Sequence, residues 1–513
     1  MTDKTQKVKK VQMADKARKE YDVIIIGAGP AGIFTALELT NQKPGARVLM
    51  ADMGKALERR NCPMRTLGRC AHCDPCAIVY GWAGAGAFSD GKLSLSPEVG
   101  GQITDYVSKA EAESLIARAD AMYLRFGAPD TVHGQNDAKV DELRYEASRH
   151  NIRLIPCPVR HLGTDRAGEV LGAMYGHLTQ NTNTEFLECA EALDLLVEQK
   201  DNGEQKIGDE PQMTGEPKIS GKQKFAGEKK ITGVTIRQNG ETMTVRAPFV
   251  VVAPGRGGAA WLTRQMHELG FTTKNNEVDI GVRVEVPNAV MDHITRHLYE
   301  AKLVYYADTY ENRVRTFCMN PGGVVSEEHY EGGIAAVNGH SYAEPERRTE
   351  NTNFAILVST HFTEPFDQPI EYGRYIAKLA NMLTGGPIMV QRLGDLLQGR
   401  RTDITRLRKS TTIPTLPTAV PGDLSFVIPS RHLTSIVEAI RAFDKLAPGL
   451  YSRNTLLYGV EVKFYSTKVR VGSRFETEIG GLYAIGDGAG ITRGLMQASC
   501  TGIVVAGDIA ERL

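Results

Sequence analysis

The feature that most constrains this chain is a glycine-rich turn between two apolar segments near its beginning. The apolar run Val23–Ile26 leads into Gly27, Gly29 and Gly32, which form a G-x-G-x-x-G pattern, and a helix-like segment follows. A second apolar run then ends at Asp52, twenty residues after the last of these glycines. This order of strand, glycine turn, helix, strand and acid is typical of a βαβ unit that binds a dinucleotide.

Each residue of this pattern has a separate predicted role. Gly27 makes the tight turn, Gly29 lets the backbone approach a pyrophosphate, and Gly32 lets the helix pack closely on the strand. The helix start offers free N–H groups to the phosphates, and Asp52 accepts a hydrogen bond from a ribose hydroxyl. The alternative is an ordinary glycine-rich turn of an α/β protein.

Length and composition narrow the class of protein. The 513 residues predict two or three domains, and 42% hydrophobic with 24% charged residues is ordinary for a globular protein. The 61 basic residues balance the 61 acidic ones, so overall charge does not indicate a nucleic-acid partner. Residues 1–20 are polar and lysine-rich, which predicts a disordered tail rather than a signal peptide. With no apolar run of membrane-spanning length, we expect a cytoplasmic protein whose cysteines are reduced or bound to metal.

Further segments follow along the chain. Residues 61–95 are rich in cysteine and glycine, 103–126 have a helical pattern, and 153–163 and 185–197 have strand character. Residues 198–230 are rich in Lys, Glu, Gln and Gly, which predicts a flexible insertion between two strands. A hairpin is predicted over 231–245, because Asn239 and Gly240 form a type I′ turn signal.

The end of the chain contains a second nucleotide-site signal. An apolar strand over 481–485 runs into Gly486 and Asp487, and a helix is predicted from Gly494. An aspartate at the carboxyl end of a parallel strand can bind a ribose or ribityl hydroxyl. A nicotinamide dinucleotide does not need this second element, whereas flavin adenine dinucleotide (FAD) does. The two ends of the chain are therefore predicted to meet in one FAD site.

Five motifs carry a resemblance to a known family. The segments GWAGAGAFSDGKL, RHLGTDR, VVVAPGRGG, VDIGVRVEVP and GDGAGITRGLMQA resemble the bacterial family of uncharacterised FAD-dependent, or NAD(FAD)-utilising, dehydrogenases. That family is placed within the glutathione-reductase-like two-domain flavoproteins. The resemblance covers about residues 21–513 and implies FAD and an oxidoreductase activity, without a substrate. The cofactor-binding residues that motif and resemblance together indicate are Gly27, Gly29, Pro30, Ala31, Gly32, Asp52, Met53, Pro254, Gly255, Gly486, Asp487, Gly494, Leu495 and Met496.

Four of the eight cysteines fall within fifteen residues. Cys62, Cys70, Cys73 and Cys76 have the spacing C-x7-C-x2-C-x2-C, and a Cys-x2-Cys turn can direct two thiolates to one metal. Three interpretations remain open: an iron–sulfur or zinc site, a redox-active dithiol beside the flavin, or free cysteines in a packed loop. The C-x4-C spacing of glutathione-reductase-type enzymes is absent from the sequence.

The predicted chemical groups lie in a glycine-dense loop after the cysteines and at the start of the last helix. Lys92 is expected to stabilise negative charge on the reduced flavin, and Ser89 or Asp90 to bind flavin N5 or substrate. Arg493 is expected to bind a carboxylate or the flavin O2 edge. The alternative is a structural loop whose charged side chains point to water. His340 and His361 are expected to be ordinary surface or core histidines.

These observations predict an α/β fold with a Rossmann-like FAD-binding domain, which has a central parallel sheet and a β-meander, plus a second α+β substrate domain. The FAD-binding domain is expected over 21–277 and 455–513, and the substrate domain over 278–454. The predicted function is an oxidoreductase that transfers hydride between an unidentified small molecule and flavin N5, with NAD(P)H as a candidate transient reductant. Two alternatives remain: an electron-transfer or redox-sensing protein that works through the four cysteines, and a flavin-dependent reductase or hydroxylase of a lipid or macromolecule.

Overall fold

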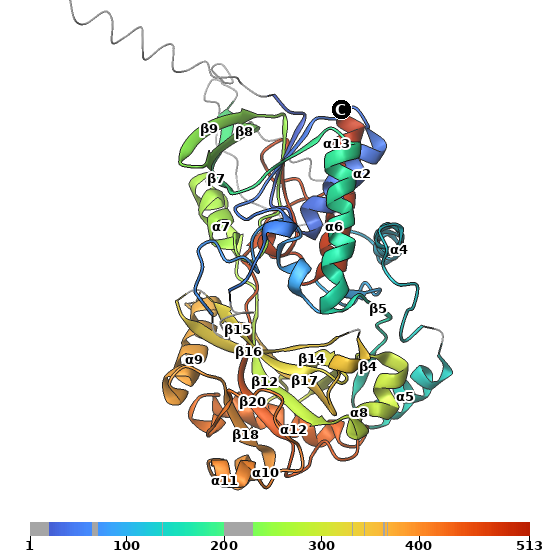
Figure 1. The fold of residues 1–513 in the computed structure, drawn as a ribbon, viewed down its shortest axis with the longest axis vertical. Helices are drawn as coiled ribbons and strands as arrows, with labels where there is room; N and C mark the ends of the chain where they lie inside the picture. The colour runs from blue at the N-terminus through green and yellow to red at the C-terminus, as the bar shows by residue number, and fades with distance from the viewer. Residues whose placement is uncertain are drawn as a thin grey trace, which may run out of the picture.

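The computed structural model has two lobes, which lie one above the other in Figure 1. Residues 1–19 of the predicted tail and 200–228 of the predicted insertion lie outside the described residues, and the ends of the predicted insertion belong to strands that stop at Gln199 and start at Lys229. No helix among those described is long and apolar enough to cross a membrane. The structure describes residues 20–63, 70–135, 137–199, 229–330, 332–342, 344–362, 365–366 and 368–513.

A parallel sheet of five strands forms the centre of the upper lobe, in the order β22-β10-β1-β2-β6. The short apolar runs of the sequence form its middle strands, which are fully buried as in other parallel sheets covered on both faces. The last strand, β22, lies beside β10, which lies beside the first strand, so the predicted meeting of the two chain ends is confirmed. The strands are β1 (Val23–Ile26), β2 (Val48–Ala51), β6 (Thr184–Leu187), β10 (Phe249–Val252) and β22 (Leu482–Ala484).

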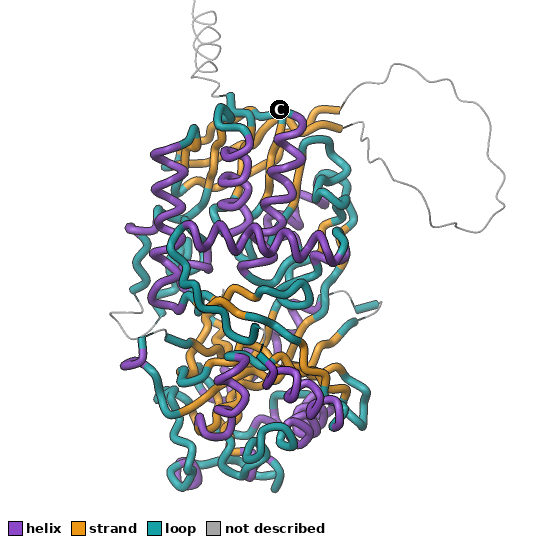
Figure 2. Tube along the Cα trace, turned by 90° about the vertical axis from the view of Figure 1, so that its right-hand side faces the viewer, coloured by secondary structure: helices purple, strands orange, loops and turns teal. Residues whose placement is uncertain are grey.

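Long helices pack beside this sheet, as the purple segments of Figure 2 show. The first and last helices of the sheet unit, α2 and α13, pack against each other, and α13 also contacts α4. Gly502 allows the close approach of α13, because a Cβ there would lie 2.4 Å from the Ala31 carbonyl oxygen. The helices of this lobe are α2 (Pro30–Gln42), α4 (Lys109–Arg125), α6 (Gly163–Asn181), α7 (Ala259–Glu268) and α13 (Leu495–Arg512).

The predicted β-meander is also present in the upper lobe. Strands β7 (Ala190–Gln199), β8 (Lys229–Gln238) and β9 (Glu241–Arg246) form an antiparallel sheet. Asn239 and Gly240, with φ of 51° and 81°, make the turn between β8 and β9. Positive φ at both positions is what a type I′ turn requires, so the hairpin prediction is confirmed.

The lower lobe is built on an eight-stranded sheet in the order β19-β18-β20-β12-β17-β14-β13-β4. Its pairings are antiparallel apart from the short β18–β19 pair, and a separate hairpin of β15 and β16 stands beside it. The strands are β4 (Arg153–Ile155), β12 (Val278–Pro287), β13 (Lys302–Tyr306), β14 (Arg313–Asn320), β15 (Val324–Tyr330), β16 (Ile334–His340), β17 (Asn351–Thr360), β18 (Met389–Arg392), β19 (Val420–Pro421) and β20 (Leu456–Lys463). The helices are α5 (Ala138–Arg149), α8 (Asn288–Leu298), α9 (Pro369–Thr384), α10 (Leu393–Leu396), α11 (Ile404–Leu407) and α12 (Ser430–Phe443).

Central strand β12 divides this sheet into an apolar face and a polar face. Its valines and Ile280 alternate into the core of the lobe, whereas Asp279, Arg283 and Glu285 occupy the other side. All three charged side chains are nonetheless buried, and each has a charged or hydroxyl partner. The two-residue period of a strand therefore produces a second buried layer, held by ion pairs of Asp279 and Arg283 and by hydrogen bonds of Glu285.

The domain boundaries differ from those predicted. Strand β20 pairs with β12 in the lower sheet, although residues 455–463 were assigned to the FAD-binding domain. Strand β4 pairs with β13 and α5 packs in the lower core, so part of the first predicted domain also belongs to the lower lobe. The cause is that the apolar pattern of a strand does not specify which sheet the strand joins.

Candidate functional site

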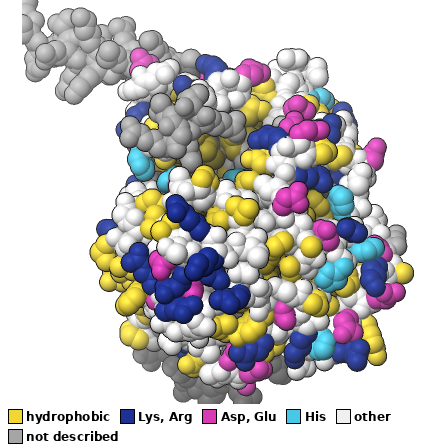
Figure 3. All heavy atoms as spheres, turned by 60° about the horizontal axis from the view of Figure 1, so that its bottom comes forward, with side chains coloured by type: hydrophobic (Ala, Val, Ile, Leu, Met, Phe, Trp, Pro, Cys, Tyr) yellow, Lys and Arg dark blue, Asp and Glu magenta, His cyan; other side chains and the backbone are white. Residues whose placement is uncertain are grey.

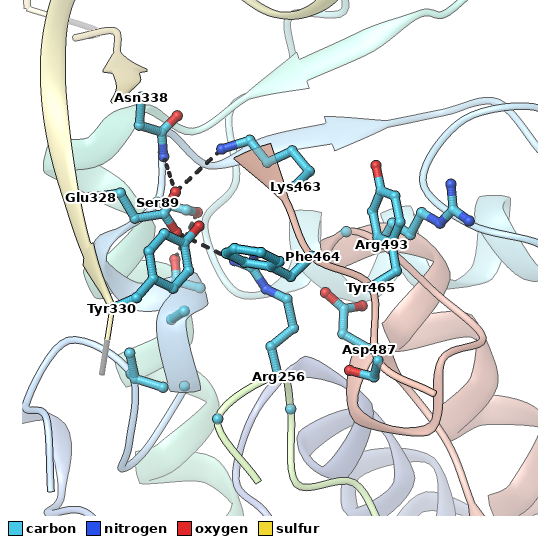
Figure 4. Close-up of a pocket in the computed structure, with 18 of the residues that line it drawn as sticks. Ser89, Arg256, Glu328, Tyr330, Asn338, Lys463, Phe464, Tyr465, Asp487 and Arg493 are labelled. Carbon is cyan, nitrogen blue, oxygen red and sulfur yellow. Dashed lines mark hydrogen bonds and ion pairs between the residues drawn. The ribbon is translucent and has the colours of Figure 1, made fainter. Parts of the chain in front are cut away.

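A cavity of about 2430 Å³ lies between the lobes. The glycine turn and the start of α13 line it from the upper lobe, and β14, β15 and β16 line it from the lower lobe. Figure 4 shows the part of this cavity where side chains of both lobes face one another. Most of the predicted site residues line this single space.

The glycine turn has the geometry that a pyrophosphate needs. Gly27 has φ of 101°, and a Cβ there would lie 2.1 Å from the Ala253 carbonyl oxygen, so no larger residue fits. A Cβ on Gly32 would lie 2.1 Å from the Gly27 carbonyl oxygen, which explains the close packing of α2. A Cβ on Gly29 would meet no atom within 4 Å in the described part of the chain, because Gly29 borders the cavity. No described side chain caps α2, so the first N–H groups of the helix are available to an anion.

Asp52 lines the cavity but is also bound to the loops around it. Its Oδ2 accepts a hydrogen bond from Ala28 N at 2.9 Å. Its Oδ1 accepts from Gly54 N at 2.9 Å and from Gly81 N at 2.6 Å. A carboxylate accepts about four hydrogen bonds, so roughly one position remains for a ribose hydroxyl. Asp52 therefore orders the glycine turn, and ribose binding stays a prediction.

The second cofactor segment lies at the C-terminal end of β22. Asp487 lines the cavity and its Oδ1 accepts a hydrogen bond from Thr492 Oγ1 at 2.6 Å. Gly488 packs against the 254–255 turn, since a Cβ there would lie 2.5 Å from the Gly255 carbonyl oxygen. Other predicted cofactor residues on the cavity wall are Gly27, Gly29, Pro30, Ala31, Pro254, Gly255, Gly486, Gly494, Leu495 and Met496. Of the predicted set, Gly32 and Met53 are not on the wall within the described residues.

Lys92 joins the two lobes rather than pointing freely into the cavity. Its Nζ donates hydrogen bonds to the Met319 carbonyl oxygen at 2.5 Å and to Asn320 Oδ1 at 2.9 Å, and it lies 3.0 Å from Asp90 Oδ2. A lysine ammonium has three donors, so these partners use all of them. The side chain is only 6% exposed. These contacts do not favour the predicted direct contact of Lys92 with the flavin.

Asp90 and Lys92 belong to a chain of alternating buried charges. Glu300 Oε2 lies 3.9 Å from Lys92 Nζ, and Lys302 donates a hydrogen bond to Glu300. Burial alone would raise the pKa of Asp90, but the ammonium of Lys92 outweighs it and holds that pKa below its ordinary value. Burial alone would lower the pKa of Lys92, but Asp90 and Glu300 outweigh it and raise that pKa. Both groups therefore stay charged at neutral pH.

Ser89 has a local role in the same loop. Its Oγ donates a hydrogen bond to the Gly86 carbonyl oxygen at 3.1 Å and accepts one from Gly91 N at 3.2 Å. These bonds fix the shape of the loop, although Ser89 also lines the cavity and is labelled there in Figure 4.

Arg493 lies immediately before α13, as predicted, and is held by the lower lobe. Its Nη1 donates a hydrogen bond to Glu277 Oε1 at 2.6 Å, and its guanidinium stacks over the Tyr465 ring at 3.8 Å. His361 Nε2 lies 3.0 Å from the other oxygen of Glu277. Arg493 Nη2 is buried and finds no hydrogen-bond partner among the described residues. This donor is therefore available to a ligand at the start of α13.

The sequence did not indicate the polar wall that the lower lobe contributes. Glu328 of β15 accepts hydrogen bonds from Lys463 Nζ at 3.2 Å and from Asn338 Nδ2 at 3.1 Å (Figure 4). Arg256 Nη2 lies 4.0 Å from Glu328 Oε1. Burial would raise the pKa of Glu328, but Lys463 and Arg256 lower it to about 2. The alternation of Glu461 and Lys463 on β20 is the signal that the sequence offers for this wall, and it becomes readable only once β20 is known to pair with β12.

His340 of β16, predicted to be an ordinary surface or core histidine, also lines the cavity. Its Nδ1 is buried and has no hydrogen-bond partner within the described ranges. Burial lowers the pKa of His340, and the nearby charge of Asp90 only partly offsets this. The imidazole is therefore neutral at pH 7 and can accept a proton.

Cys62, Cys70, Cys73 and Cys76 are free cysteines, and all four line the same cavity. In the described part of the chain, no three Cys, His, Asp or Glu side chains are arranged to hold a metal ion. Residues 64–69, between the first two cysteines, are not described. The metal and dithiol interpretations therefore both stay predictions.

Comparison with known proteins finds one similar sequence and several solved structures of low similarity. An uncharacterised protein of Clostridium beijerinckii is 26% identical over 519 residues, which cover 95% of this chain and 80% of that protein. L-proline dehydrogenase from P. horikoshii overlays with a TM-score of 0.40 at 12% identity, covering 97% of this chain and 95% of the other. Glycine oxidase from Geobacillus kaustophilus overlays with a TM-score of 0.37 at 13% identity, covering 96% and 95%.

A protein-family model described as "FAD-dependent protein, C-terminal domain-like" matches residues 277–464. The matched segment begins just before β12 and ends just after β20, so its limits agree with the main part of the lower lobe. The predicted placement among glutathione-reductase-like proteins is not confirmed by these comparisons. The match supports FAD as the cofactor and an FAD-dependent oxidoreductase as the class of enzyme.

Proposed function

We propose that this protein is an FAD-dependent oxidoreductase that transfers hydride between a small-molecule substrate and flavin N5 in the cavity between its lobes. One observation carries the proposal. A single cavity runs from the glycine turn, past Asp487 and the start of α13, to the polar wall of the lower lobe. A cofactor with a dinucleotide at one end and a reactive ring at the other matches such a path.

The residues present fit FAD along this path. The N–H groups at the start of α2 would bind the pyrophosphate, and Asp487 would accept a hydrogen bond from the ribityl chain. The start of α13 and Arg493 Nη2 would face the ring edge where negative charge gathers on reduction. When bound, FAD supplies a two-electron acceptor and donor to the site.

The lower lobe would orient the substrate and receive its proton. The pair of Glu328 and Lys463 offers both an acceptor and a donor to polar groups of a substrate. We assign His340 Nδ1 as the acceptor of the proton that leaves a substrate carbon or heteroatom together with the hydride, because this atom is buried, neutral and without a partner among the described residues. NAD(P)H remains a candidate transient reductant.

The test begins with protein purified gently and without added flavin. We expect the absorbance of oxidised flavin at about one FAD per chain, and anaerobic bleaching by one member of a metabolite panel. His340→Gln should keep the FAD but slow this bleaching at least about a hundredfold, as for loss of a general base. His150→Gln, at the residue that follows α5 and does not line the cavity, should react like the wild type. A colourless protein that takes up no added FAD would contradict the proposal.

A second candidate function is electron transfer through the four cysteines, which is favoured by their position on the wall of the same cavity. In that case electrons would pass between the flavin and a partner protein through a metal site or a dithiol. The two functions are compatible, since a flavin enzyme can be reoxidised by a second redox group in the same protein.

Metal and thiol analysis of Cys70→Ser separates the interpretations. Loss of iron and of a broad visible absorbance band would indicate an iron–sulfur cluster, and loss of zinc alone would indicate a zinc site. A metal-free wild type whose accessible thiols fall by two on oxidation would indicate a dithiol. Cys189→Ser is the control, because Cys189 is exposed and lies outside the cavity wall. If none of these properties changes, the cysteines are only structural.

A further inference from the structure

The end of the lower lobe that lies farthest from the upper lobe carries a cluster of basic residues. It is formed by α10, α11 and the segments that follow them, at the bottom of Figure 1. Figure 3, which brings this end forward, shows Lys and Arg side chains gathered on one area with hydrophobic side chains beside them. We call this area the basic face. Its cations are Arg400, Arg401, Arg406, Arg408, Lys409 and Arg453.

Few acidic residues neutralise the basic face. Arg400 Nε lies 2.9 Å from Asp395 Oδ1, and Arg406 Nη1 lies 3.0 Å from Asp403 Oδ2. The other four cations form no salt bridge with any described residue. Because the whole chain has a formal charge of zero, this face is a local concentration of positive charge.

Exposed apolar side chains accompany these cations. Leu397 and Ile404 are 43% and 53% exposed, and Ile413 and Phe426 are 76% and 73% exposed. Single exposed apolar residues are common, but here four stand among cations in one region.

Hydrogen bonds join the segments that carry these side chains. Thr402 N donates to the Gly422 carbonyl oxygen at 3.0 Å, which brings the 400–404 segment beside the segment that leads to Phe426. Ser410 Oγ donates to the Asn454 carbonyl oxygen at 3.2 Å, which joins the end of the basic run to Arg453. These bonds place the 400–404 segment, the segment that leads to Phe426 and the residue after Arg453 side by side, and Ile413 follows Lys409 by four residues.

We propose that the basic face binds the surface of an anionic phospholipid bilayer. Guanidinium and ammonium groups would pair with lipid phosphates, while the apolar side chains would enter the boundary between headgroups and acyl chains. A nucleic acid would use the cations but would leave Ile413 and Phe426 in water. An anionic bilayer satisfies both kinds of side chain, so it is the occupant that the whole face favours.

The test is flotation of the full-length protein with lipid vesicles. We expect binding to phosphatidylcholine vesicles that contain phosphatidylglycerol, at least about tenfold weaker binding to pure phosphatidylcholine, and weakening by salt. The double variant Arg401→Glu/Arg408→Glu should lower binding at least about tenfold. Ile413→Ser/Phe426→Ser should also lower binding but should keep the salt dependence, because it leaves the charges in place.

A matched control comes from α5, elsewhere on the same lobe. Arg144→Glu/Tyr145→Ser replaces one exposed cation and one exposed aromatic residue there, and should leave binding unchanged. Each variant is checked by its thermal melting profile, so that misfolding is not mistaken for lost binding. Equal binding to both kinds of vesicle, or no effect of the charge reversal, overturns the proposal. Tight binding to duplex DNA with none to vesicles also overturns it and assigns the face to nucleic acid.

Discussion

Replacing Gly29 with valine is expected to remove FAD binding while leaving the protein folded. The backbone at Gly29 has φ of −78° and ψ of −178°, which any residue adopts, and an added Cβ meets no described atom within 4 Å. The new side chain would instead project into the space predicted for the pyrophosphate. We expect the affinity for FAD to fall at least about a hundredfold, measured by titration of the apoprotein, because phosphate contacts would be lost together with space.

Two further glycine variants separate a loss of FAD binding from a loss of folding. Gly45→Val is the matched control, since Gly45 also has no described atom within 4 Å of an added Cβ but lies on the exposed loop before β2. It should bind FAD normally. Gly27→Val should reduce folding itself, because its Cβ would lie 2.1 Å from a backbone oxygen and its φ is positive. Normal FAD affinity in Gly29→Val would contradict the proposed position of the pyrophosphate.

Replacing Lys92 with methionine is expected to destabilise the contact between the lobes strongly. The change removes the charged partner of Asp90 and two hydrogen bonds to the 319–320 segment of β14. Leaving a buried charge without its partner typically costs about 3–5 kcal/mol. We expect a lower calorimetric melting temperature, with partial recovery in the double variant Asp90→Asn/Lys92→Met, which removes both charges.

The pH dependence of the stability lost in Lys92→Met tests whether that loss is electrostatic. In the wild type, the lowered pKa of Asp90 contributes stability that is present at neutral pH and is lost as pH falls through that lowered value. In Lys92→Met the largest charge that offsets burial is lost, which leaves only the weaker effects of His161 and His340, so the pKa of Asp90 should rise above its ordinary value. The difference in melting temperature between the wild type and Lys92→Met should then shrink as pH falls from 8 toward 5, because Asp90 becomes neutral in the variant. A deficit that does not change over this range would indicate lost packing alone.

The features that the sequence predicted correctly have local causes. The glycine turn, the apolar strand β1 and the hairpin turn at Asn239 each depend on residues that lie next to one another in the chain. A steric requirement for glycine, or for positive φ, is visible in such a segment without knowledge of its neighbours. The meeting of the two ends of the chain was predictable because an FAD site would need both segments, whereas the partner strand of β22 was not.

The features that were missed depend on contacts between distant segments. Met319 and Asn320, which accept hydrogen bonds from Lys92, lie more than two hundred residues away, so the sequence could not indicate that the other lobe holds this side chain. The loop contacts of Asp52 depend on Gly81, which the βαβ pattern does not include. The role of Glu328 requires β15 and β20 to be neighbours, and that adjacency follows from tertiary packing rather than from sequence period.

The position of β22 and α13 has a consequence for how this protein is made. Asp487 and the start of α13 are synthesised after all the other described strands of both lobes. They nevertheless complete the wall around the predicted flavin ring. A nascent chain that lacks 482–512 would display the glycine turn while missing that wall. If the proposed function holds, stable capture of the flavin is therefore expected only after residues 482–512 have been synthesised.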